Sequence, residues 1–387
     1  MKILYISLNL LTRNVSSGGD HIFLETALRW SQKGHDMTLL IPSVSVNEFK
    51  EKIPGSNLLE IKPSFLEREG LYNRCFFLVF PIYIIRTLKA LKIIKKVKDF
   101  DLVVTNGDFF CNVIPASKIK DSQWLSFIYH INESPLKRKG NSLLMSCVSY
   151  LMQRFSFRII KKDSDSVVLL NHQVRNDLTQ IGFDDKKLHV EGCGINFKQI
   201  QKYPPEPELR YDVCALGRIY PTKGVFDLPL IWEQVIKINP SYRLAIIGTG
   251  PEVWVEKLKS LIEEKGLSEN IHLLGFLSPE KVYGLMKSAR LFVTASYEEG
   301  WGISVCEAMA CGLPVIAYDL QAFKEVFGKS IELVPRGNTR IMAERILFYL
   351  NNEDICLQKK IILHDLASKY DWDTITGNYL NTITMRN

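Results

Sequence analysis

Short apolar segments alternate with amphipathic segments along most of the chain. The first apolar segment, "KILYIS", is followed by "HIFLETALRWSQKG", which has helical periodicity, and then by a second apolar segment, "DMTLLIP". Short apolar runs are typical of strands buried on both faces of a sheet, and the longer periodic segments between them are typical of helices. This alternation predicts βαβ units and a parallel sheet.

The alternation occurs in two series. "DLVVTN" and "SDSVVLLN" continue the first series, and after residue 210 the apolar segments are "YDVCALGR", "YRLAIIGTG", "NIHLLGF", "LFVTAS" and "LPVIAYD". Between the series lies "NFKQIQKYPPEPELR", which is rich in proline and charge, has no apolar period and is interpreted as an interdomain linker. At ~100–200 residues per domain, 387 residues suit two domains.

We therefore predict an α/β protein with two doubly wound, Rossmann-like domains facing across a cleft. The expected domains are residues 1–200 and 201–365. The last segment, about 366–387 and including "YDWDTITGNYLNTI", is expected to be a terminal helix that packs back on the first domain. In such sheets ligands bind beyond the carboxyl ends of the strands, so side chains that follow the strands are the candidates for function.

Positive charge is concentrated in the first half. Residues 1–200 carry 28 Lys and Arg against 19 Asp and Glu, a balance of +9, whereas residues 201–387 carry 21 against 23, a balance of −2. This asymmetry predicts that the first domain meets an anionic partner. No nucleic-acid-binding motif is present, so a membrane surface or a phosphorylated acceptor is favoured over nucleic acid.

The longest apolar run, "CFFLVFPIYII" at 75–85, is shorter than the ~20 residues that a spanning helix needs, and we expect no transmembrane helix. One interpretation is that this run and the basic segment after it lie flat on an anionic membrane. The alternative is a soluble domain with a charged helix, and the sequence does not separate the two. The basic side chains assigned to the membrane interpretation are Arg86, Lys89, Lys92 and Lys96, with Arg138, Lys139, Arg154 and Arg158 in addition.

The stretch "EEGWGISVCEAMACGLPVIAYD", at 298–319, carries the strongest chemical signal. It places Glu299 before a glycine-flanked tryptophan, in the order Gly300, Trp301, Gly302 and Ile303, and Glu307 inside the helical segment that follows. Glycines at a helix start let a ligand approach the first amides, which favour a phosphate. The two carboxylates suit the vicinal hydroxyls of a sugar and a ribose. Alternatively, Ser304 and Glu307 form an S-x-x-E capping box, and Glu299 is a solvated loop charge.

A second stretch, "ALGRIYPTKG", supplies cations after a predicted strand. It contains Gly217, Arg218 and Lys223, and a turn at Pro221 brings the two charged groups together. A guanidinium and an ammonium at one point suit a diphosphate and stabilise the charge that develops as it departs. Two exposed loop cations are the alternative.

Three weaker signals also follow predicted strands. Gly248 and Gly250 in "IIGTGPE" form half of a dinucleotide fingerprint, but valine occupies position 253, which argues against a nicotinamide cofactor. Gly18 and Gly19 precede a predicted helix and are a candidate phosphate contact, and His130 ends an apolar strand. Plain turns and a structural histidine remain the alternatives for these positions.

No metal site is predicted. The D-x-D strings at 163–165 and 371–373 do not follow strands, and no His or Cys cluster has zinc spacing. We expect chemistry without metal or cofactor, with Arg218 and Lys223 in the place of a cation. The eight cysteines include no C-x-x-C pair, which suits a reducing cytoplasm.

Taken together in this order, "SSGGDHIF", "GRIYPTKG", "IIGTGPE" and "LLGFLSPEKVYGLMKSARLFVTASYEEGWGISVCEAMACGLPVIAYD" resemble the retaining glycosyltransferases of the GT-B fold, family 4, also called group 1. The resemblance covers nearly the whole chain and is strongest from about 210 to 320. It implies an acceptor-binding domain first and a nucleotide-sugar domain second. The roles it implies are the donor sugar for Glu299, the ribose for Glu307, the diphosphate for Arg218 and Lys223, a loop closing over the donor for Gly19, and a position near the sugar for His130.

The expected function is retaining, metal-independent transfer of a sugar from a nucleoside diphosphate sugar to a hydroxyl of a glycan or lipid-linked acceptor, in cell-surface polysaccharide or glycolipid synthesis. The expected location is the cytoplasm, including the inner face of the plasma membrane. Two alternatives stay open: a nucleotide-sugar epimerase of the same architecture, and a non-catalytic nucleotide-sugar-binding subunit.

Overall fold

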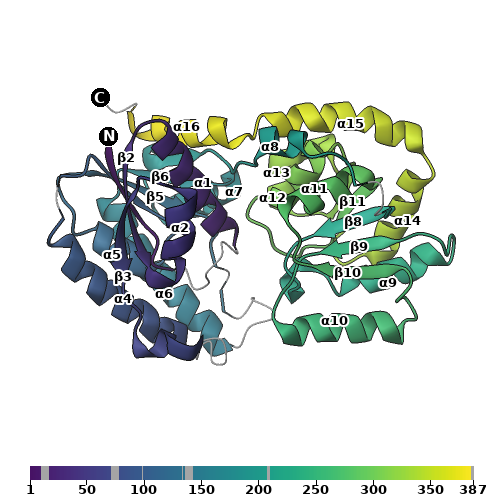
Figure 1. Cartoon of the computed structure of the whole chain (residues 1–387), viewed down its shortest axis with the longest axis horizontal. Helices are drawn as coiled ribbons and strands as arrows, with labels where there is room; N and C mark the ends of the chain where they lie inside the picture. The colour runs from purple at the N-terminus through teal and green to yellow at the C-terminus, as the bar shows by residue number, and fades with distance from the viewer. Residues whose placement is uncertain are drawn as a thin grey trace. The chain divides into compact units, whose positions relative to one another are not determined.

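A computed structural model describes the chain in two compact units (Figure 1). Unit 1 consists of Met1–Cys193 and Trp372–Asn387, and unit 2 of Gly194–Asp371. The boundary therefore falls a few residues before the expected domain limit at 200. The residues that the structure describes are 1–9, 17–70, 78–97, 99–132, 134–135, 143–206 and 210–384.

Unit 1 contains a seven-stranded sheet of order β3-β2-β1-β4-β5-β6-β7, in which all neighbouring strands are parallel. The chain leaves β1 in one direction to β2 and β3 and then returns to β4 on its other side. This reversal creates a switch point between β1 and β4. The strands are β1 (Lys2–Ile6), β2 (Asp36–Pro42), β3 (Asn57–Ile61), β4 (Leu102–Thr105), β5 (Gln123–Ile128), β6 (Ser166–Leu169) and β7 (Leu188–Val190).

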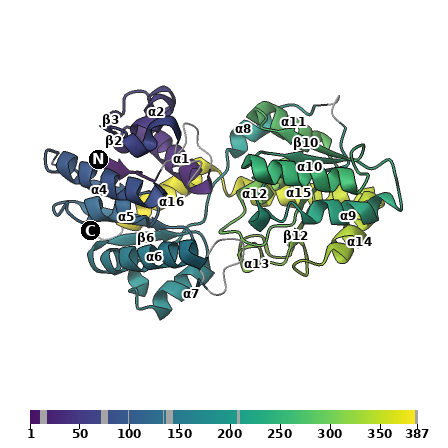
Figure 2. The same cartoon turned by 90° about the horizontal axis from the view of Figure 1, so that it is seen from below.

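Helices cover both faces of this sheet (Figures 1 and 2). They bury an aromatic and aliphatic core that includes Trp124, Phe157 and the interior of β1. The helices of unit 1 are α1 (Gly18–Gln32), α2 (Val46–Lys52), α4 (Val79–Ile94), α5 (Phe110–Ala116), α6 (Leu143–Asp163), α7 (His172–Gln180) and α16 (Trp372–Thr384).

The terminal helix α16 packs on α1 and β6 of unit 1. The Trp30 indole donates a hydrogen bond to the carbonyl oxygen of Thr376 at 2.9 Å, and the Tyr379 hydroxyl donates one to the carbonyl oxygen of Gly192 at 2.9 Å. Both aromatic side chains are fully buried. The last helix of the sequence is thus part of the core of unit 1.

Unit 2 repeats the architecture with a six-stranded parallel sheet of order β10-β9-β8-β11-β12-β13. Its switch point lies between β8 and β11, and with both sheets described, the predicted pair of doubly wound α/β domains is confirmed. The strands are β8 (Val213–Leu216), β9 (Leu244–Ile247), β10 (Ile271–Gly275), β11 (Leu291–Thr294), β12 (Val315–Tyr318) and β13 (Glu332–Val334). The helices are α8 (Phe197–Lys202), α9 (Asp227–Ile236), α10 (Glu252–Glu264), α11 (Pro279–Ser288), α12 (Ile303–Ala310), α13 (Gln321–Phe327), α14 (Thr339–Leu350) and α15 (Glu353–Ser368).

The interpretation of 196–210 as an interdomain linker was wrong for its first part. Residues 197–202 form α8, which packs on α12, and Ile200 is fully buried. The Lys287 ammonium donates hydrogen bonds to the carbonyl oxygens of Ile200 at 2.7 Å and Tyr203 at 2.6 Å. This segment is therefore anchored to unit 2. Its short helix is too brief to show an apolar period, which is why the sequence did not indicate it.

Helix α4 corrects one part of the membrane interpretation. The Arg86 side chain, expected on a basic face, is 2% exposed. It forms a salt bridge with Glu67 at 2.6 Å and donates a hydrogen bond to the carbonyl oxygen of Leu8. A buried arginine needs such partners, and here it fixes the segment after β1 rather than facing a membrane. Residues 138 and 139 of the same interpretation lie outside the described residues.

Among the described residues, no helix is both long and apolar enough to cross a membrane.

The burial of Tyr379 makes the contribution of α16 to unit 1 measurable. We expect Tyr379→Ala to lower the free energy of unfolding by about 3 kcal/mol, because it removes a buried ring and a buried hydrogen bond. Thr374→Ala, on the exposed side of the same helix, is the matched control. Urea unfolding followed by tryptophan fluorescence measures both, and equal midpoints for the two variants would contradict the packing described above.

Candidate functional site

Three loops meet at the carboxyl edge of the unit 2 sheet. The loop after β8 is joined to the loop after β9 by a hydrogen bond from the Ile219 amide to the Thr249 carbonyl oxygen, at 3.0 Å. It is joined to the loop after β11 by a hydrogen bond from the Tyr297 amide to the Thr222 carbonyl oxygen, at 2.8 Å. Since β9, β8 and β11 are neighbours, these bonds hold side chains from distant parts of the sequence at one place.

Lys223 and Glu299 meet directly at this edge. The Lys223 ammonium lies 2.7 Å from Glu299 Oε1, and the two side chains are 24% and 16% exposed. The Ser296 hydroxyl donates a second hydrogen bond to the same carboxylate oxygen at 2.8 Å. Lys223 ends a 3-10 turn, Pro221–Lys223, which Gly224 closes in the left-handed conformation. The turn predicted at Pro221 therefore exists and presents the lysine to Glu299.

Arg218 is exposed at the same edge, two residues after β8. No ion pair or hydrogen bond of its guanidinium is found within the part of the chain that the structure describes. The preceding residue, Gly217, donates its amide to the Ile247 carbonyl oxygen at 3.0 Å, which fixes the loop from which Arg218 projects. An exposed arginine on a fixed loop is available to an anion.

Helix α12 begins at this edge after β11. Its N-cap is Gly302, with φ of +107°, and no side chain caps the first turn. A Cβ at this glycine would lie 2.7 Å from the Phe323 ring, so a larger residue would strain both backbone and packing. The S-x-x-E capping box is therefore not formed. The first amides of α12, from Ile303 onward, have no intrahelical partner and carry the positive end of the helix dipole.

Glu307 lies inside α12 and forms a hydrogen bond with a neighbouring helix instead of capping its own helix. It accepts a hydrogen bond from the Tyr283 hydroxyl of α11 at 2.7 Å. The Tyr283 ring in turn stacks on Tyr203, which follows α8. Burial raises the pKa of the Glu307 carboxyl from 4.5 to about 7, and the tyrosine hydrogen bond opposes the shift. Near neutral pH this acid is poised between its two forms, which is typical of functional positions.

The Trp301 side chain does not face solvent at this edge. It is 3% exposed and packs edge-on against Phe327 and Tyr370. Its indole serves the packing of unit 2, so a ligand contact at position 301, like one at Gly300, would come from the main chain. The sequence placed Trp301 correctly in the loop but did not reveal that its side chain points inward.

Gly248 and Gly250 allow the loops after β8 and β9 to approach each other closely. A Cβ at Gly248 would lie 2.0 Å from the Gly217 carbonyl oxygen, and one at Gly250 would lie 2.1 Å from the Ile219 carbonyl oxygen. These distances exclude any side chain without movement of the backbone. The packing of the two loops alone thus requires both glycines, whatever they contribute to a ligand.

In unit 1, Gly18 and Gly19 are the first two residues of α1. Ser17 is the N-cap and forms a capping box with Asp20, whose side chain accepts a hydrogen bond from the Ser17 amide at 3.1 Å. A Cβ at Gly19 would lie 2.9 Å from the Tyr129 ring. The glycine therefore lets the segment after β5 pass close to the start of α1. Residues 10–16, which precede this helix, are outside the described part of the chain.

His130, which was predicted to end an apolar strand, lies two residues after β5 and is exposed. Its main chain is held by Gln153 of α6, which donates to the His130 carbonyl oxygen at 2.9 Å and accepts from the Asn132 amide at 2.8 Å. Asp108, which follows β4, is buried beside it. Burial raises the pKa of the Asp108 carboxyl, while the charge of His130 and a hydrogen bond with Gln153 oppose the shift. His130 is thus an exposed side chain on a fixed main chain, with a buried acid next to it.

The sequence analysis missed the polar network around His130. Asn106 donates to the Ser7 hydroxyl at 2.8 Å and accepts a hydrogen bond from the Tyr129 hydroxyl, linking the ends of β1, β4 and β5. Asp108 and Gln153 also escaped notice. The string "TNGDFF" after a predicted strand was a signal for Asn106 and Asp108, because polar residues after parallel strands share one edge. Nothing in the helical sequence around Gln153 indicated its role.

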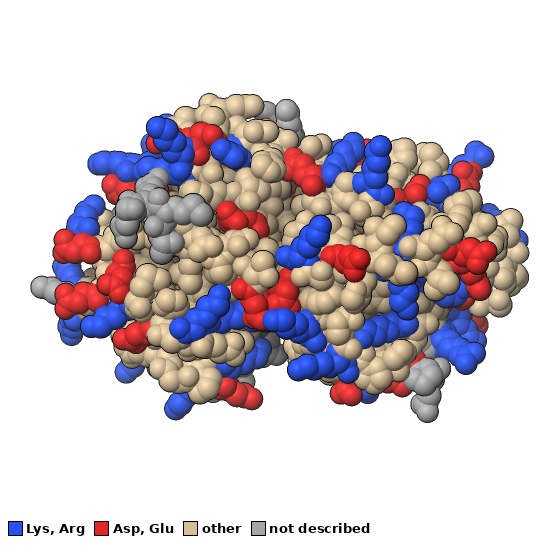
Figure 3. Space-filling model, turned by 90° about the horizontal axis from the view of Figure 1, so that it is seen from above, with Lys and Arg blue, Asp and Glu red and all other residues tan. Residues whose placement is uncertain are grey.

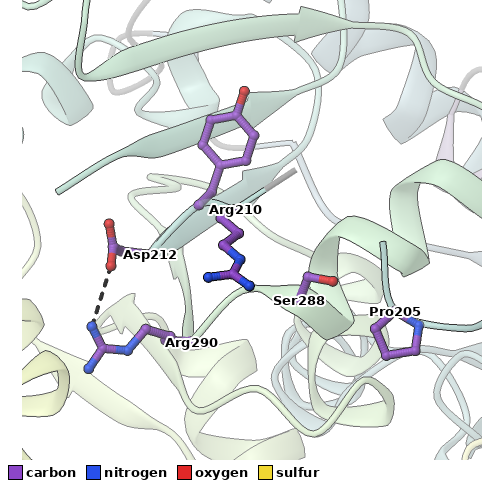
Figure 4. Close-up of a pocket in the computed structure, with 6 residues that line it drawn as sticks. Pro205, Arg210, Asp212, Ser288 and Arg290 are labelled. Atoms are coloured by element: carbon purple, nitrogen blue, oxygen red, sulfur yellow. Dashed lines mark hydrogen bonds and ion pairs between the residues drawn. The ribbon is translucent and has the colours of Figure 1, made fainter. Parts of the chain in front are cut away.

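A shallow pocket lies at the other edge of the unit 2 sheet (Figure 4). Tyr211 and Asp212 precede β8, and Arg290 precedes β11, with an Asp212–Arg290 ion pair at 3.3 Å. This is the amino edge of the strands, away from Lys223 and Glu299. Within the described residues, no group of three or more His, Cys, Asp or Glu side chains is arranged to hold a metal ion.

Comparison with known proteins finds a family model that matches most of unit 2. Residues 196–362 match the family model of glycosyl transferases group 1. The relatives include a phosphatidyl-myo-inositol mannosyltransferase of Mycobacterium leprae, 30% identical over 48% of this chain and 50% of its own length. They also include a GDP-mannose:cellobiosyl-diphosphopolyprenol alpha-mannosyltransferase of Xanthomonas oryzae, 28% identical over 43% of this chain and 44% of its own. The chain thus matches about half the length of these curated relatives or less.

Solved structures resemble the chain over its whole length. Sucrose-phosphate synthase from Thermosynechococcus elongatus matches with a TM-score of 0.80 at 17% identity, covering 100% of both chains. HepE from Anabaena, in complex with UDP and glucose, matches with a TM-score of 0.75 at 17% identity over 100% of both chains. At this identity the likeness concerns the fold, which is of the GT-B type. The chain accordingly has a GT-B fold, and its residues 196–362 are similar to the group 1 glycosyltransferases.

Proposed function

We propose that the chain transfers a glycosyl group from a nucleoside diphosphate sugar to a hydroxyl of a glycan or lipid-linked acceptor, with retention of configuration and without a metal ion. The observation that carries the proposal is the cluster at the carboxyl edge of unit 2. There the Lys223–Glu299 pair, exposed Arg218 and the uncapped start of α12 lie on loops tied by backbone hydrogen bonds. The family-model match over this unit and the names of its relatives support the donor and acceptor classes.

The donor diphosphate is assigned to the cations and the helix start. A guanidinium binds two phosphate oxygens at once, and the first amides of α12 add donors that need no reorganisation. The Lys223 ammonium has three protons, so it can hold Glu299 and a phosphate oxygen together. In this arrangement Lys223 links the leaving group to the carboxylate that faces the sugar.

The two acids are assigned to hydroxyl groups. Glu299 accepts hydrogen bonds from the transferred sugar, and Glu307, one turn inside α12, accepts them from the ribose. Tyr283 keeps the Glu307 carboxyl in place before the ribose arrives. Ribose hydroxyls favour the ionised form of Glu307, since hydrogen bonds to a carboxylate lower its pKa.

In the transfer step, the bond between the anomeric carbon and the diphosphate oxygen breaks, and a bond to the acceptor oxygen forms on the same face of the sugar. The acceptor proton passes to the leaving diphosphate oxygen. Arg218 and Lys223 stabilise the negative charge that remains on the diphosphate. Retention follows because nucleophile and leaving group use one face.

His130 is assigned to the transferred sugar, and Asp108 acts through His130 as a positioning residue. The Gln153 side chain fixes the main chain around His130, and the buried carboxyl of Asp108 orients the imidazole. Both residues follow strands next to the β1/β4 switch point, which is where such a sheet presents ligand-binding groups.

The proposal is tested first by identifying a donor and a product. A thermal-shift panel of UDP-, GDP- and ADP-sugars selects the donor, and mass spectrometry with acceptor extracts detects the product. NMR of that product reports the anomeric configuration, which we expect to match that of the donor. A donor that is epimerised without transfer supports the epimerase alternative and contradicts the proposal, and an inverted product contradicts the retaining mechanism.

Removing either cation should slow transfer. Arg218→Ala or Lys223→Ala is expected to lower kcat at least about tenfold, since the departing diphosphate loses a charged partner. Lys265→Ala, which removes a lysine paired with Glu233 elsewhere in unit 2, is the matched control. Steady-state kinetics of all three variants decide the point, and wild-type kcat in both site variants would remove the leaving-group assignment.

Glu307 should make donor binding depend on pH. Its carboxyl has a pKa of about 7 in the free protein, so the ionised fraction rises through neutral pH, and a sugar nucleotide is expected to bind up to about tenfold more tightly at pH 8 than at pH 6. Glu307→Gln should bind more weakly at pH 8 and lose the pH dependence. Calorimetric titration at both pH values measures this, with Glu298→Gln, an exposed neighbour, as control.

The same shift has a consequence for stability. Because the folded-state pKa is raised from 4.5 to about 7, the unfolded chain ionises first as the pH rises, and wild-type stability falls between these values. Glu307→Gln should therefore gain stability relative to wild type from pH 5 to pH 8. A constant difference in melting temperature across this range would show that the carboxyl titrates normally.

Asp108 should affect turnover but not the binding of a nucleoside diphosphate without its sugar. Asp108→Asn keeps the shape of the side chain but removes its charge, and we expect roughly tenfold lower kcat with an altered pH profile. The dissociation constant of the nucleoside diphosphate without its sugar should stay unchanged, because the contacts assigned to its phosphates and ribose lie in unit 2. Asp121→Asn, on the surface of unit 1, is the control. A lower melting temperature with an unaltered pH profile would indicate a structural role only.

A further inference from the structure

Helix α4 exposes a row of large apolar side chains. Phe80, Ile84 and Leu88 follow one another at intervals of four residues, so they share one face of the helix, and their exposed fractions are 42%, 39% and 57%. The same row continues into exposed Lys92, with Lys95 beside it. The face is thus apolar over the first part of the helix and cationic at its end.

Helix α6 repeats this pattern. Leu144, Leu151 and Phe155 lie on one side of the helix by their spacing and are 60%, 65% and 47% exposed. Arg158 and Lys162 extend the row toward the end of the helix and are exposed too. Two separate segments therefore present the same apolar-to-basic order along their length.

The two rows belong to one surface. α5 packs against both α4 and α6, and the three helices lie side by side on one face of the unit 1 sheet (Figure 2). The rings of Phe80 on α4 and Phe110 on α5 are 5.9 Å apart. Because α4 and α6 run in the same direction after their strands, their apolar halves lie at the same end of this surface, on either side of α5, and their basic ends lie at the other end.

This surface almost lacks acids. The sequences of α4 and α5 contain no Asp or Glu, and α6 contains one, Asp163, as its last residue. Elsewhere the signs are mixed: on the face of the chain seen in Figure 3, basic and acidic side chains are interspersed. Helix α15 of unit 2 also exposes Leu357 and Ile361, but acidic residues accompany its lysines.

We propose that the exposed faces of α4 and α6 dock on an anionic lipid surface, with Phe80, Ile84, Leu88, Leu144, Leu151 and Phe155 entering the boundary between headgroups and acyl chains. Lys92, Lys95, Arg158 and Lys162 meet the lipid phosphates. Apolar side chains with nearby cations and no acids are the composition of interfacial helices. The proposal does not depend on the transfer reaction.

A second copy of the chain fits this surface less well. An isologous contact would place the basic ends of α4 and α6 against the same surface of the partner. Asp163 is the one acid within the three helices, and Asp99, Asp101 and Asp121 lie in the loops after them, so cations outnumber acids and the basic ends of two copies would repel one another. An anionic lipid surface instead complements both the apolar rows and their charge.

Vesicle flotation tests the proposal with the full chain. Vesicles of phosphatidylcholine alone are compared with vesicles of phosphatidylcholine and phosphatidylglycerol. We expect the chain to float with the anionic vesicles, to partition at least about tenfold less into neutral ones, and to dissociate as salt is raised. A chain that stays at the bottom with both kinds of vesicle overturns the proposal.

Surface variants locate the contact. The double variant Leu151→Ser and Phe155→Ser should partition at least about tenfold less into anionic vesicles, and so should Lys92→Glu with Arg158→Glu. The matched control is Leu357→Ser with Ile361→Ser on α15, which removes two apolar side chains at least as exposed as Leu151 and Phe155. This control should float like the wild type. These positions are exposed, so unchanged melting temperatures are expected and verify folding.

The outcomes separate this inference from the proposed transferase activity. Equal flotation of the α4/α6 variants and wild type would place any lipid contact elsewhere and overturn the assignment. If the wild type forms a dimer that Leu151→Ser with Phe155→Ser dissociates, without vesicle binding, the surface is a contact between copies and the lipid proposal is wrong. Thermal shifts with sugar nucleotides should be the same in all these variants, whichever result is obtained.

Discussion

Backbone hydrogen bonds between the loops that follow β8, β9 and β11 hold the candidate site of unit 2 together. Ile219 is bonded to Thr249, and Tyr297 to Thr222, so that residues far apart in sequence become neighbours. Without these bonds Lys223 would have no fixed position relative to Glu299. The glycines at 248 and 250 belong to the same arrangement, because a side chain at either would collide with the neighbouring loop.

Both units place polar or charged residues after the strands near their switch points. In unit 2 the charged groups follow β8 and β11, and in unit 1 the polar network follows β1, β4 and β5. Parallel strands end at one edge, so each sheet gathers polar residues from several loops while its interior stays apolar. The two sites differ in chemistry: unit 2 presents cations and a helix start, whereas unit 1 presents amides, a histidine and a buried acid. Under the proposed function, the cations and helix start of unit 2 suit the diphosphate of the donor, and the polar groups of unit 1 suit hydroxyl groups.

The sequence predicted most of the strands and the pair of doubly wound domains, because these depend on local apolar patterns, but it did not indicate the short strands β3, β7 and β13. It did not predict side-chain direction. Trp301, predicted as a donor contact, turns inward, and Arg86, predicted on a basic face, is buried against Glu67. Whether Glu307 caps its helix or bonds across to Tyr283 depends on where α11 packs. Gln153 and the anchoring of α8 likewise rest on tertiary contacts that carry no local signal.

The central claim is that a pyrophosphate binds at the carboxyl edge of unit 2. A crystal structure with a bound nucleoside diphosphate tests it most directly. The account predicts that the phosphates contact Arg218, Lys223 and the first amides of α12, with a ribose hydroxyl on Glu307. Phosphates bound instead at the amino edge, in the pocket beside Arg290, would contradict it.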